Sequence, residues 1–92
     1  MKEYKLLDFW ADWCSPCKLM NPIIDEIEND YQNVEVVRIN ADENKDMVQK
    51  YKIMTVPTYI LIKDEEIVSI VKGAMPKYRF LQMLGLDKIQ PN

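Results

Sequence analysis

Two short apolar segments enclose a stretch with helical periodicity, and this arrangement most constrains the fold. Tyr4 to Trp10 and Val34 to Ile39 are rich in aromatic and aliphatic residues and are too short for helices, so each predicts a strand. Between them, apolar side chains recur at helical spacing at Met20, Ile23, Ile24, Ile27 and Tyr31. The spacing predicts a helix from about Cys14 to Tyr31. Two strands joined through a helix are expected to be parallel, with a right-handed crossover.

The predicted helices also have recognisable starts and stops. Pro22 lies inside the long helix and should kink it, because the carbonyl group of Lys18 loses its hydrogen-bond donor. Asp42 suits the N-cap of a short second helix, whose apolar residues are Met47, Val48 and Tyr51. Pro76 is expected in the first turn of a last helix that stops at Gly85. The apolar face of that helix consists of Phe80, Leu81 and Leu84.

Two further apolar segments, Thr58 to Lys63 and Ile67 to Val71, predict two more strands. They are joined tightly through Asp64-Glu65, so we expect an antiparallel hairpin. The element order is then βαβαββα, which predicts an α/β fold with a four-stranded mixed sheet and three helices on its two faces. No repeat or linker divides the chain, so residues 1–92 are expected to form a single domain. The content of 48% hydrophobic residues is enough for a modest core.

The charge pattern and the apolar runs argue against several classes of protein. The net charge is −3 and no cluster of Lys and Arg stands out, so a nucleic-acid-binding protein is not expected. The N-terminal segment reaches Asp8 after only two leucines and lacks the apolar core of a secretion signal. The longest strongly apolar run, Tyr59 to Ile62, is far too short for a membrane span. We therefore expect a cytoplasmic protein in a reducing compartment, where permanent disulfides are uncommon. The protein is also expected to be a monomer.

Both cysteines of the chain, Cys14 and Cys17, lie in the segment WADWCSPCK. A structural zinc site needs four nitrogen or sulfur ligands, and the chain has no histidine and no third cysteine. Zinc could then be bound only by a dimer that pools two pairs. A structural disulfide is also a poor explanation. Closing a loop of about four residues stabilises a fold by only about 2 kcal/mol, against about 3 kcal/mol for about fifteen residues.

A reactive dithiol is the third interpretation, and the position of the pair favours it. Cys14 falls between the first predicted strand and the long helix, where unpaired N–H groups and the positive end of the helix dipole stabilise a thiolate. Cys17 lies one turn later and is expected to face inward more, which suits a resolving cysteine. Pro16 is tolerated in the first helical turn and stiffens the loop. A C-x-x-C motif near a βαβ pattern is typical of redox proteins.

These residues resemble the active-site region of the thioredoxin family. Asp8 to Lys18 is similar to the family's active-site segment, Val56-Pro57-Thr58 to its cis-proline loop, and Gly73-Ala74 to the loop after its last strand. The resemblance extends from about Leu6 to Leu84, with the motifs in matching order. It implies a minimal thioredoxin-like fold of glutaredoxin-like size, in which the N-terminal strand and helix of the full-length family are missing.

The resemblance favours one of two readings for several residues. Asp8 could be an acid at a strand end, half in water, or a buried carboxyl. The resemblance favours burial, which would raise the pKa of Asp8 and let it take the Cys17 proton through a water. Pro57 is implied to follow a cis peptide bond, which would bring the Val56 backbone beside the dithiol to pair with an extended substrate. Arg38 could be a solvated edge charge, or it could face Asp8 as a lysine of the family does.

Other residues near the motif are candidates for a docking surface. Trp13 could belong to the core, but a large aromatic residue directly before the first cysteine better suits one wall of such a surface. Gly73 could simply end a strand, or, together with Ala74, it could leave room for a partner backbone. Ser15 and Pro16, between the cysteines, are also expected to touch a substrate. Ser15 stands where the family usually has glycine. The redox potential of the Cys14–Cys17 pair therefore cannot be inferred from the resemblance.

The sequence thus predicts a thiol-disulfide oxidoreductase that reduces disulfide-containing protein substrates. Cys14 would attack the substrate disulfide, and Cys17 would then attack Cys14 to release the reduced substrate. No bound cofactor or metal is required, because a separate thioredoxin-reductase-like donor would return the electrons. Two alternatives stay open. One is a specialised, glutaredoxin-like hydrogen donor to one enzyme such as ribonucleotide reductase, and the other is a redox-inert thioredoxin-fold module that only binds partners.

Overall fold

The helices and strands follow one another in the order that the sequence predicts. The computed structural model describes residues 2–89 and residue 91. Its elements are β1 (Tyr4–Trp10), α1 (Ser15–Asp30), β2 (Val34–Asn40), α2 (Lys45–Lys50), β3 (Thr58–Lys63), β4 (Glu66–Lys72) and α3 (Lys77–Leu84), followed by the 3-10 turn η1 (Leu86–Lys88). The predicted bounds of the four strands agree with these to within one residue.

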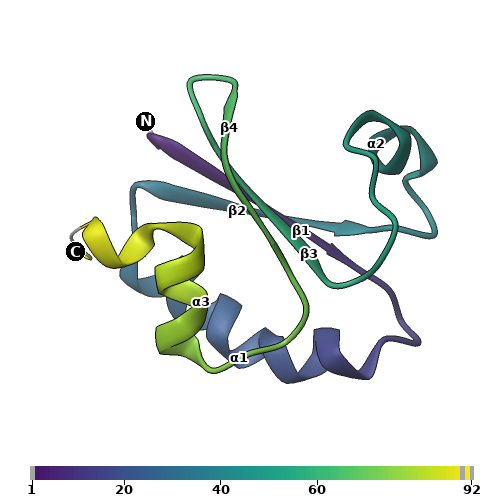
Figure 1. Cartoon of the computed structure of the whole chain (residues 1–92), viewed down its shortest axis with the longest axis horizontal. Coiled ribbons are helices and arrows are strands. Elements are labelled where there is room, and N and C mark those ends of the chain that lie inside the picture. Colours follow the sequence, from purple (N-terminus) through teal and green to yellow (C-terminus); the bar gives the residue numbers. More distant parts are fainter. Residues whose placement is uncertain (1, 90, 92) are drawn as a thin grey trace.

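The four strands form one mixed sheet in the order β2-β1-β3-β4 (Figure 1). β1 and β2 are parallel and are joined through α1, whereas β1 pairs antiparallel with β3, and β3 pairs antiparallel with β4. The register places Asp8 of β1 directly beside Arg38 of β2 and Tyr59 of β3. A carboxyl group, a guanidinium group and a phenol therefore start from adjacent positions on three neighbouring strands.

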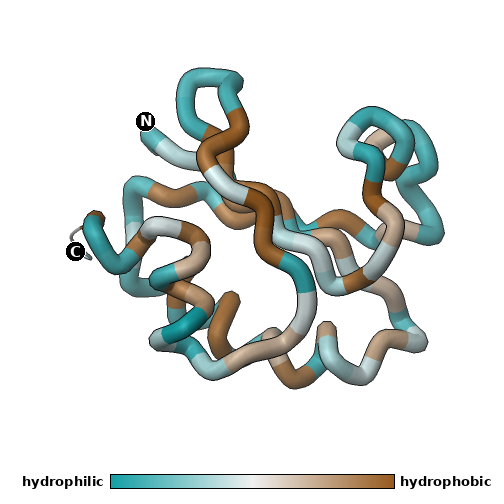
Figure 2. Tube along the Cα trace, viewed as in Figure 1, coloured by the Kyte–Doolittle hydropathy of each residue, from teal (hydrophilic) through white to brown (hydrophobic). Residues whose placement is uncertain are grey.

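Helices cover both faces of the sheet, and each face has its own apolar core. α1 and α3 lie on one face, and α2 lies on the other (Figure 1). Because side chains alternate along a strand, Leu6 and Asp8 of β1 point toward α1, whereas Leu7 and Phe9 point toward α2. Figure 2 shows hydrophobic residues along the strands and hydrophilic residues at the tip of the β3–β4 hairpin. Asp8 is thus a charged residue within an apolar layer.

Helix α1 is held against the sheet by one apolar stripe. Its buried residues are Cys17, Met20, Ile24 and Ile27, and this spacing follows one face of a helix. Burial of each large aliphatic side chain contributes roughly 1.5–3 kcal/mol. Cys14 is the N-cap, Pro16 lies in the first turn, and the helix continues through Pro22 to its end. The stripe therefore fixes the start of α1, and with it both cysteines, next to the end of β1.

Two predicted helix starts are wrong, and both differences are local. The N-cap of α2 is Asn44, which makes no side-chain capping bond, whereas Asp42 lies in the preceding turn and accepts a hydrogen bond from Trp13 instead. Pro76 is the N-cap of α3 and not a first-turn residue, because its ψ of 152° is extended. The predicted stop at Gly85 is confirmed, since its φ of 92° is in the left-handed region that glycine adopts without strain.

Candidate active site

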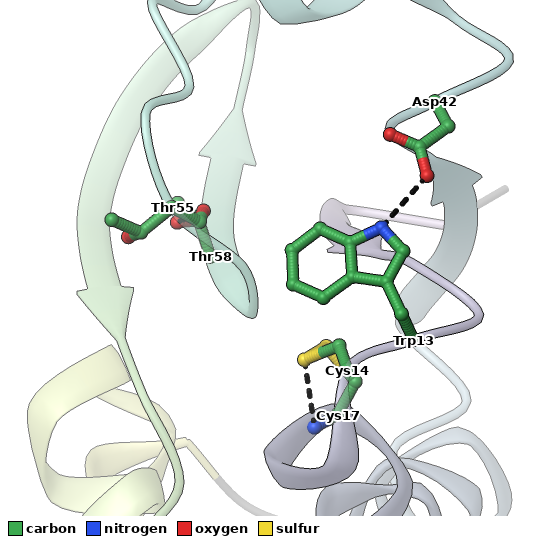
Figure 3. Close-up of a disulfide and its surroundings, with 6 residues drawn as sticks. All are labelled: Trp13, Cys14, Cys17, Asp42, Thr55 and Thr58. Carbon is green, nitrogen blue, oxygen red and sulfur yellow. Dashed lines mark hydrogen bonds between the residues drawn. A yellow bond between two sulfur atoms is a disulfide. The ribbon is translucent and has the colours of Figure 1, made fainter.

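The two cysteines form a disulfide at the N-terminus of α1 (Figure 3). Their Cα atoms are 5.3 Å apart. Cys14 is the N-cap residue, and its Sγ atom accepts a hydrogen bond from the backbone N–H of Cys17 at 3.2 Å. After reduction, this N–H group and the positive end of the helix dipole would stabilise a thiolate on Cys14. The geometry therefore favours Cys14 as the nucleophile.

The exposure of the two cysteines does not follow the prediction. The sequence predicts that Cys17 faces inward more than Cys14, but the two residues are similarly buried, with exposed fractions of 4% and 2%. The reason is that Ala11, Trp10 and Val56 pack around the pair in a small apolar cluster. The assignment of the two roles therefore rests on the N-cap position of Cys14 and not on exposure.

A cavity of about 260 Å³ lies behind the disulfide, on the side of Cys17. It is lined by Asp8, Trp10, Ala11, Asp12, Cys17, Lys18, Asn21 and Arg38. Its volume is large enough for water, whose share of liquid volume is about 30 Å³, and the polar side chains in its lining offer hydrogen-bond partners. Cys17 and Asp8 therefore line one cavity that has room for water.

Asp8 is the buried acid of this cavity. Its exposed fraction is 3%, and desolvation raises its pKa to about 6, against a smaller opposite effect of the Arg38 charge. Arg38 does not form an ion pair with Asp8, because its guanidinium donates to Asp25 at 2.6 Å and to Glu28 at 3.5 Å. The pKa of the neighbouring Tyr59 is also raised, first by desolvation and then by the negative charge of Asp8. Burial is therefore the main determinant of the proton affinity of Asp8.

On the other side of the disulfide, Trp13 forms an exposed wall (Figure 3). The residue is 71% exposed, and its indole N–H donates to the carboxylate of Asp42 at 2.9 Å. This bond ties the loop before α1 to the loop after β2. Sequence reasoning missed the contact, because the two residues are 29 positions apart and their spacing carries no signal. Ser15 and Pro16 lie nearby in the first turn of α1 and are exposed.

The loop before β3 lies across from Trp13 and the cysteines (Figure 3). The Val56–Pro57 peptide bond in this loop is cis. The hydroxyl group of Thr58 donates to the carbonyl oxygen of Thr55 at 2.7 Å, which closes the turn around the proline. Val56 packs against the apolar cluster that contains both cysteines. The loop therefore places Val56 next to the dithiol.

The loop after β4 is joined to the proline loop through Gly73. The Gly73 N–H donates to the carbonyl oxygen of Pro57 at 3.0 Å, and its φ of 90° is left-handed, which glycine adopts without strain. Apart from Gly73 and its two chain neighbours, no heavy atom lies within 4 Å of the point where a Cβ atom would stand, so this place is open. Ala74, which follows, is exposed. The structure thus brings the two predicted loops together.

These features define a class of site. One sulfur atom lies where a thiolate is stabilised, and the other shares a cavity with a buried acid that can accept a proton. A nucleophilic thiolate and a second, resolving thiol are the two groups that thiol–disulfide exchange requires. The site is therefore that of a thiol-disulfide oxidoreductase.

Comparison with known proteins agrees with this class. The model of the thioredoxin family matches residues 1–85. The chain is 41% identical over 81 residues to a thioredoxin of Staphylococcus epidermidis, covering 87% of this chain and 78% of that protein. It is 45% identical over 73 residues to thioredoxin 1 of Synechococcus elongatus, covering 78% of this chain and 68% of that protein. A thioredoxin structure from Nicotiana alata has a TM-score of 0.85 and 32% identity, covering 98% of this chain and 76% of that one. The chain belongs to the thioredoxin family.

Two further properties concern membranes and metals. Within residues 2–89 and 91, no helix is both long enough and apolar enough to span a bilayer. In the same part of the chain, His, Cys, Asp and Glu side chains form no group of three or more that could hold a metal ion.

Proposed function

We propose that the protein reduces disulfide bonds of protein substrates through the Cys14–Cys17 dithiol. The observation that carries this proposal is the N-cap geometry of Cys14, whose Sγ atom accepts the Cys17 N–H at the positive end of α1. A sulfur atom held in this position is stabilised as a thiolate, which is the nucleophile of thiol–disulfide exchange. Membership in the thioredoxin family supports the same activity.

The proposed reaction has two displacements. In the first, the Cys14 thiolate attacks one sulfur of the substrate disulfide, forms a mixed disulfide and expels the other substrate sulfur as a thiolate. In the second, Cys17 loses its proton, attacks the Cys14 sulfur and expels the second substrate sulfur as a thiolate. The substrate has then gained two electrons and takes up two protons. The dithiol has become the Cys14–Cys17 disulfide, which is the form of the present structure.

Asp8 is the proposed proton acceptor for the second displacement. Cys17 and Asp8 line the same cavity, so a water molecule there can relay the proton between them. With a pKa of about 6, the carboxyl group is mostly ionised at neutral pH. It nevertheless holds a proton better than an ordinary aspartate, whose pKa is about 3.9. Asp8 therefore suits transient storage of the proton that Cys17 loses.

The proposed substrate surface surrounds the outer side of the disulfide. Its residues are Trp13, Ser15, Pro16, Val56, Pro57, Gly73 and Ala74. They come from the loop before α1, the first turn of α1, the cis-proline loop and the loop after β4. An extended substrate segment would pair with the backbone of Val56. Gly73 would leave room for the partner backbone, because it has no side chain.

The proposal includes a separate electron donor and a cytoplasmic site of action. Each turnover leaves the Cys14–Cys17 disulfide, so a thioredoxin-reductase-like protein must return two electrons before the next cycle. A reducing compartment such as the cytoplasm favours net reduction of substrates. The protein would act there as a monomer and without a bound cofactor.

Reduction of insulin tests the proposal directly. With dithiothreitol as the electron source, the wild-type protein should accelerate the precipitation of free insulin B chain. Cys14→Ser should lose this acceleration, and Tyr78→Ala, which changes an exposed aromatic residue on α3, should keep it. Wild-type protein that is fully folded but inactive in this assay would contradict a general protein-disulfide reductase.

A further inference from the structure

Arg38 has an acidic neighbour in the sheet and acidic partners on a helix, and the structure shows it bound to the helix. On the sheet, Arg38 of β2 is the direct neighbour of Asp8 on β1, and both residues line the cavity behind Cys17. Opposite charges on adjacent strands stabilise one another when they pair. The guanidinium instead reaches α1, where Nη2 donates to Asp25 Oδ1 at 2.6 Å and to Glu28 Oε1 at 3.5 Å.

The two acids of α1 act on the same nitrogen atom of Arg38. Asp25 and Glu28 are three residues apart and therefore lie on the same face of the helix. The contact with Asp25, at 2.6 Å, is slightly shorter than the roughly 2.7–2.9 Å that is typical of a charge-assisted hydrogen bond. The contact with Glu28, at 3.5 Å, is at the outer limit of a hydrogen bond. Asp25 is therefore the main partner and Glu28 a weaker second one.

Several elements contribute ionisable groups around Asp8. They are Arg38 from β2, Tyr59 from β3, Asp12 from the loop after β1, and Cys17 and Lys18 from α1. Arg38 is the cation among them whose charge lowers the pKa of Asp8. The position of the Arg38 guanidinium therefore affects how readily Asp8 accepts a proton.

We propose that Asp25 is a positioning residue for proton transfer, which holds the Arg38 guanidinium on α1 and keeps the Asp8 carboxylate available to the Cys17 proton. This inference rests on the proposed function of Asp8. Without Asp25, Arg38 can turn toward Asp8, and an ion pair there would lower the pKa of Asp8. A weaker base takes up the Cys17 proton less readily, so release of the substrate from the mixed disulfide would slow.

The pKa of Asp8 in the oxidised protein tests the position of Arg38 without any catalysis. The ¹³C chemical shift of the Asp8 carboxyl group is followed as the pH is varied. The wild-type protein should titrate near pH 6, and Asp25→Asn should lower the pKa of Asp8 by about one unit or more. Glu26→Gln is the matched control, because it removes the same charge from the same helix but its partner is Lys77 at 2.6 Å. An unchanged Asp8 pKa in Asp25→Asn would overturn the proposal.

A direct electrostatic effect of Asp25 on Asp8 has the same sign, and Arg38→Met separates the two effects. Removing a nearby negative charge would lower the pKa of Asp8 even if Arg38 did not move. In an Arg38→Met background, Asp25→Asn should leave the pKa of Asp8 nearly unchanged if Asp25 acts through Arg38. A fall of the same size with and without Arg38 would show a direct effect and would also overturn the proposal.

The rate of the second displacement, in which Cys17 resolves the mixed disulfide, tests whether the position of Arg38 affects turnover. Mixing reduced protein with dithiobis(nitrobenzoate) releases one thionitrobenzoate when Cys14 attacks and a second when Cys17 resolves the mixed disulfide. At neutral pH, Asp25→Asn should slow the second release several-fold, and Glu26→Gln should not. A lowered Asp8 pKa together with a wild-type second release would overturn the role of Asp25 in proton transfer. Failure of the wild-type protein to reduce insulin would instead refute the proposed function. The titration in the oxidised protein would still test whether Asp25 keeps the Arg38 guanidinium on α1.

Discussion

The two sides of the disulfide have opposite character. The inner side, next to Cys17, borders a cavity that the buried Asp8 and the partly exposed Arg38 line, so it contains charged groups. The outer side has the exposed Trp13 and the apolar Val56, so it is open and mainly hydrophobic. Charges interact more strongly where water is excluded, whereas an exposed apolar surface is suited to contact with another chain.

This difference separates two tasks that a disulfide reductase must perform. In the proposed reaction, the outer side would admit a substrate to Cys14, and the inner side would accept the proton of Cys17. Recognition requires accessible surface, whereas the raised pKa of Asp8 comes mainly from burial, so the two tasks use different environments. Substitutions on the two sides should therefore change different quantities: pH dependence and stability on the inner side, and substrate affinity on the outer side.

The largest effect is expected at the cysteines, where the two sides meet. Cys14→Ser removes the nucleophile and should abolish reduction of substrate disulfides. Cys17→Ser keeps the nucleophile but removes the resolving thiol, so a mixed disulfide through Cys14 should accumulate. Mass spectrometry of the trapped species identifies the linked residue. Trapping through Cys17 in Cys14→Ser, with none through Cys14 in Cys17→Ser, would reverse the two roles.

On the inner side, Asp8→Asn should make the fold more stable at neutral pH. The pKa of Asp8 is about 6 in the folded protein and about 3.9 in an unfolded chain. Between these values the folded protein keeps a proton that the unfolded chain has released, so the free energy of unfolding falls as the pH rises. At about 1.4 kcal/mol per pKa unit, Asp8→Asn should be more stable than wild type by up to about 3 kcal/mol at about pH 7. Below about pH 4 this difference should disappear, because Asp8 is then protonated in both states.

Denaturant unfolding of both proteins at the two pH values measures this difference. The same variant should slow the second displacement, because Cys17 loses its proton acceptor. Arg38 should not oppose the gain in stability, since Asp25 and Glu28 remain as its partners when the charge of Asp8 is removed. A clear loss of stability in Asp8→Asn at neutral pH would mean that Asp8 takes part in a stabilising ion pair.

The sequence predicts the helices and strands that carry the site better than it predicts the side-chain contacts within the site. The start of α1 at the cysteines could be predicted, because the spacing of apolar residues along a helix is local information. The partners of Arg38 could not, because the contact joins β2 to α1 across 13 positions and depends on how the helix lies on the sheet. The hydrogen bond from Trp13 to Asp42 could not be predicted either, because it joins two loops 29 positions apart. The burial of Cys14 also depends on packing, since Val56 reaches it from a distant loop.

On the outer side, Trp13→Ala should weaken substrate binding with little loss of stability. Its side chain is exposed and its hydrogen bond to Asp42 lies at the surface, so the free energy of unfolding should fall by at most about 1 kcal/mol. The KM for insulin should rise several-fold, because a large apolar contact is lost, while the pKa of Asp8 stays the same. Ile67→Ala at the start of β4, also exposed, is the control for loss of an apolar side chain elsewhere. If the KM of Trp13→Ala equals that of Ile67→Ala and of wild type, Trp13 does not belong to the docking surface.

The smallest effect is expected at Ser15, the first residue of α1, which follows Cys14 directly. A hydroxyl group that donates to a thiolate lowers the pKa of the thiol and stabilises the reduced form. A better-stabilised reduced form makes a more oxidising couple, so Ser15→Gly should have a more negative reduction potential. If the hydrogen bond contributes about 1 kcal/mol, the change is about 20 mV, since about 30 mV corresponds to about 1.4 kcal/mol.

Equilibration with glutathione or dithiothreitol buffers, followed by alkylation of the free thiols, measures this potential. Ser15→Ala is the matched control, because it removes the hydroxyl group without the added backbone freedom of glycine. Both variants should shift in the same direction and by a similar amount if the hydroxyl group is the cause. A shift in Ser15→Gly alone would assign the effect to the backbone at the helix start. Unchanged potentials in both would mean that the stability of the Cys14 thiolate depends on the N-cap position and not on the residue that follows it.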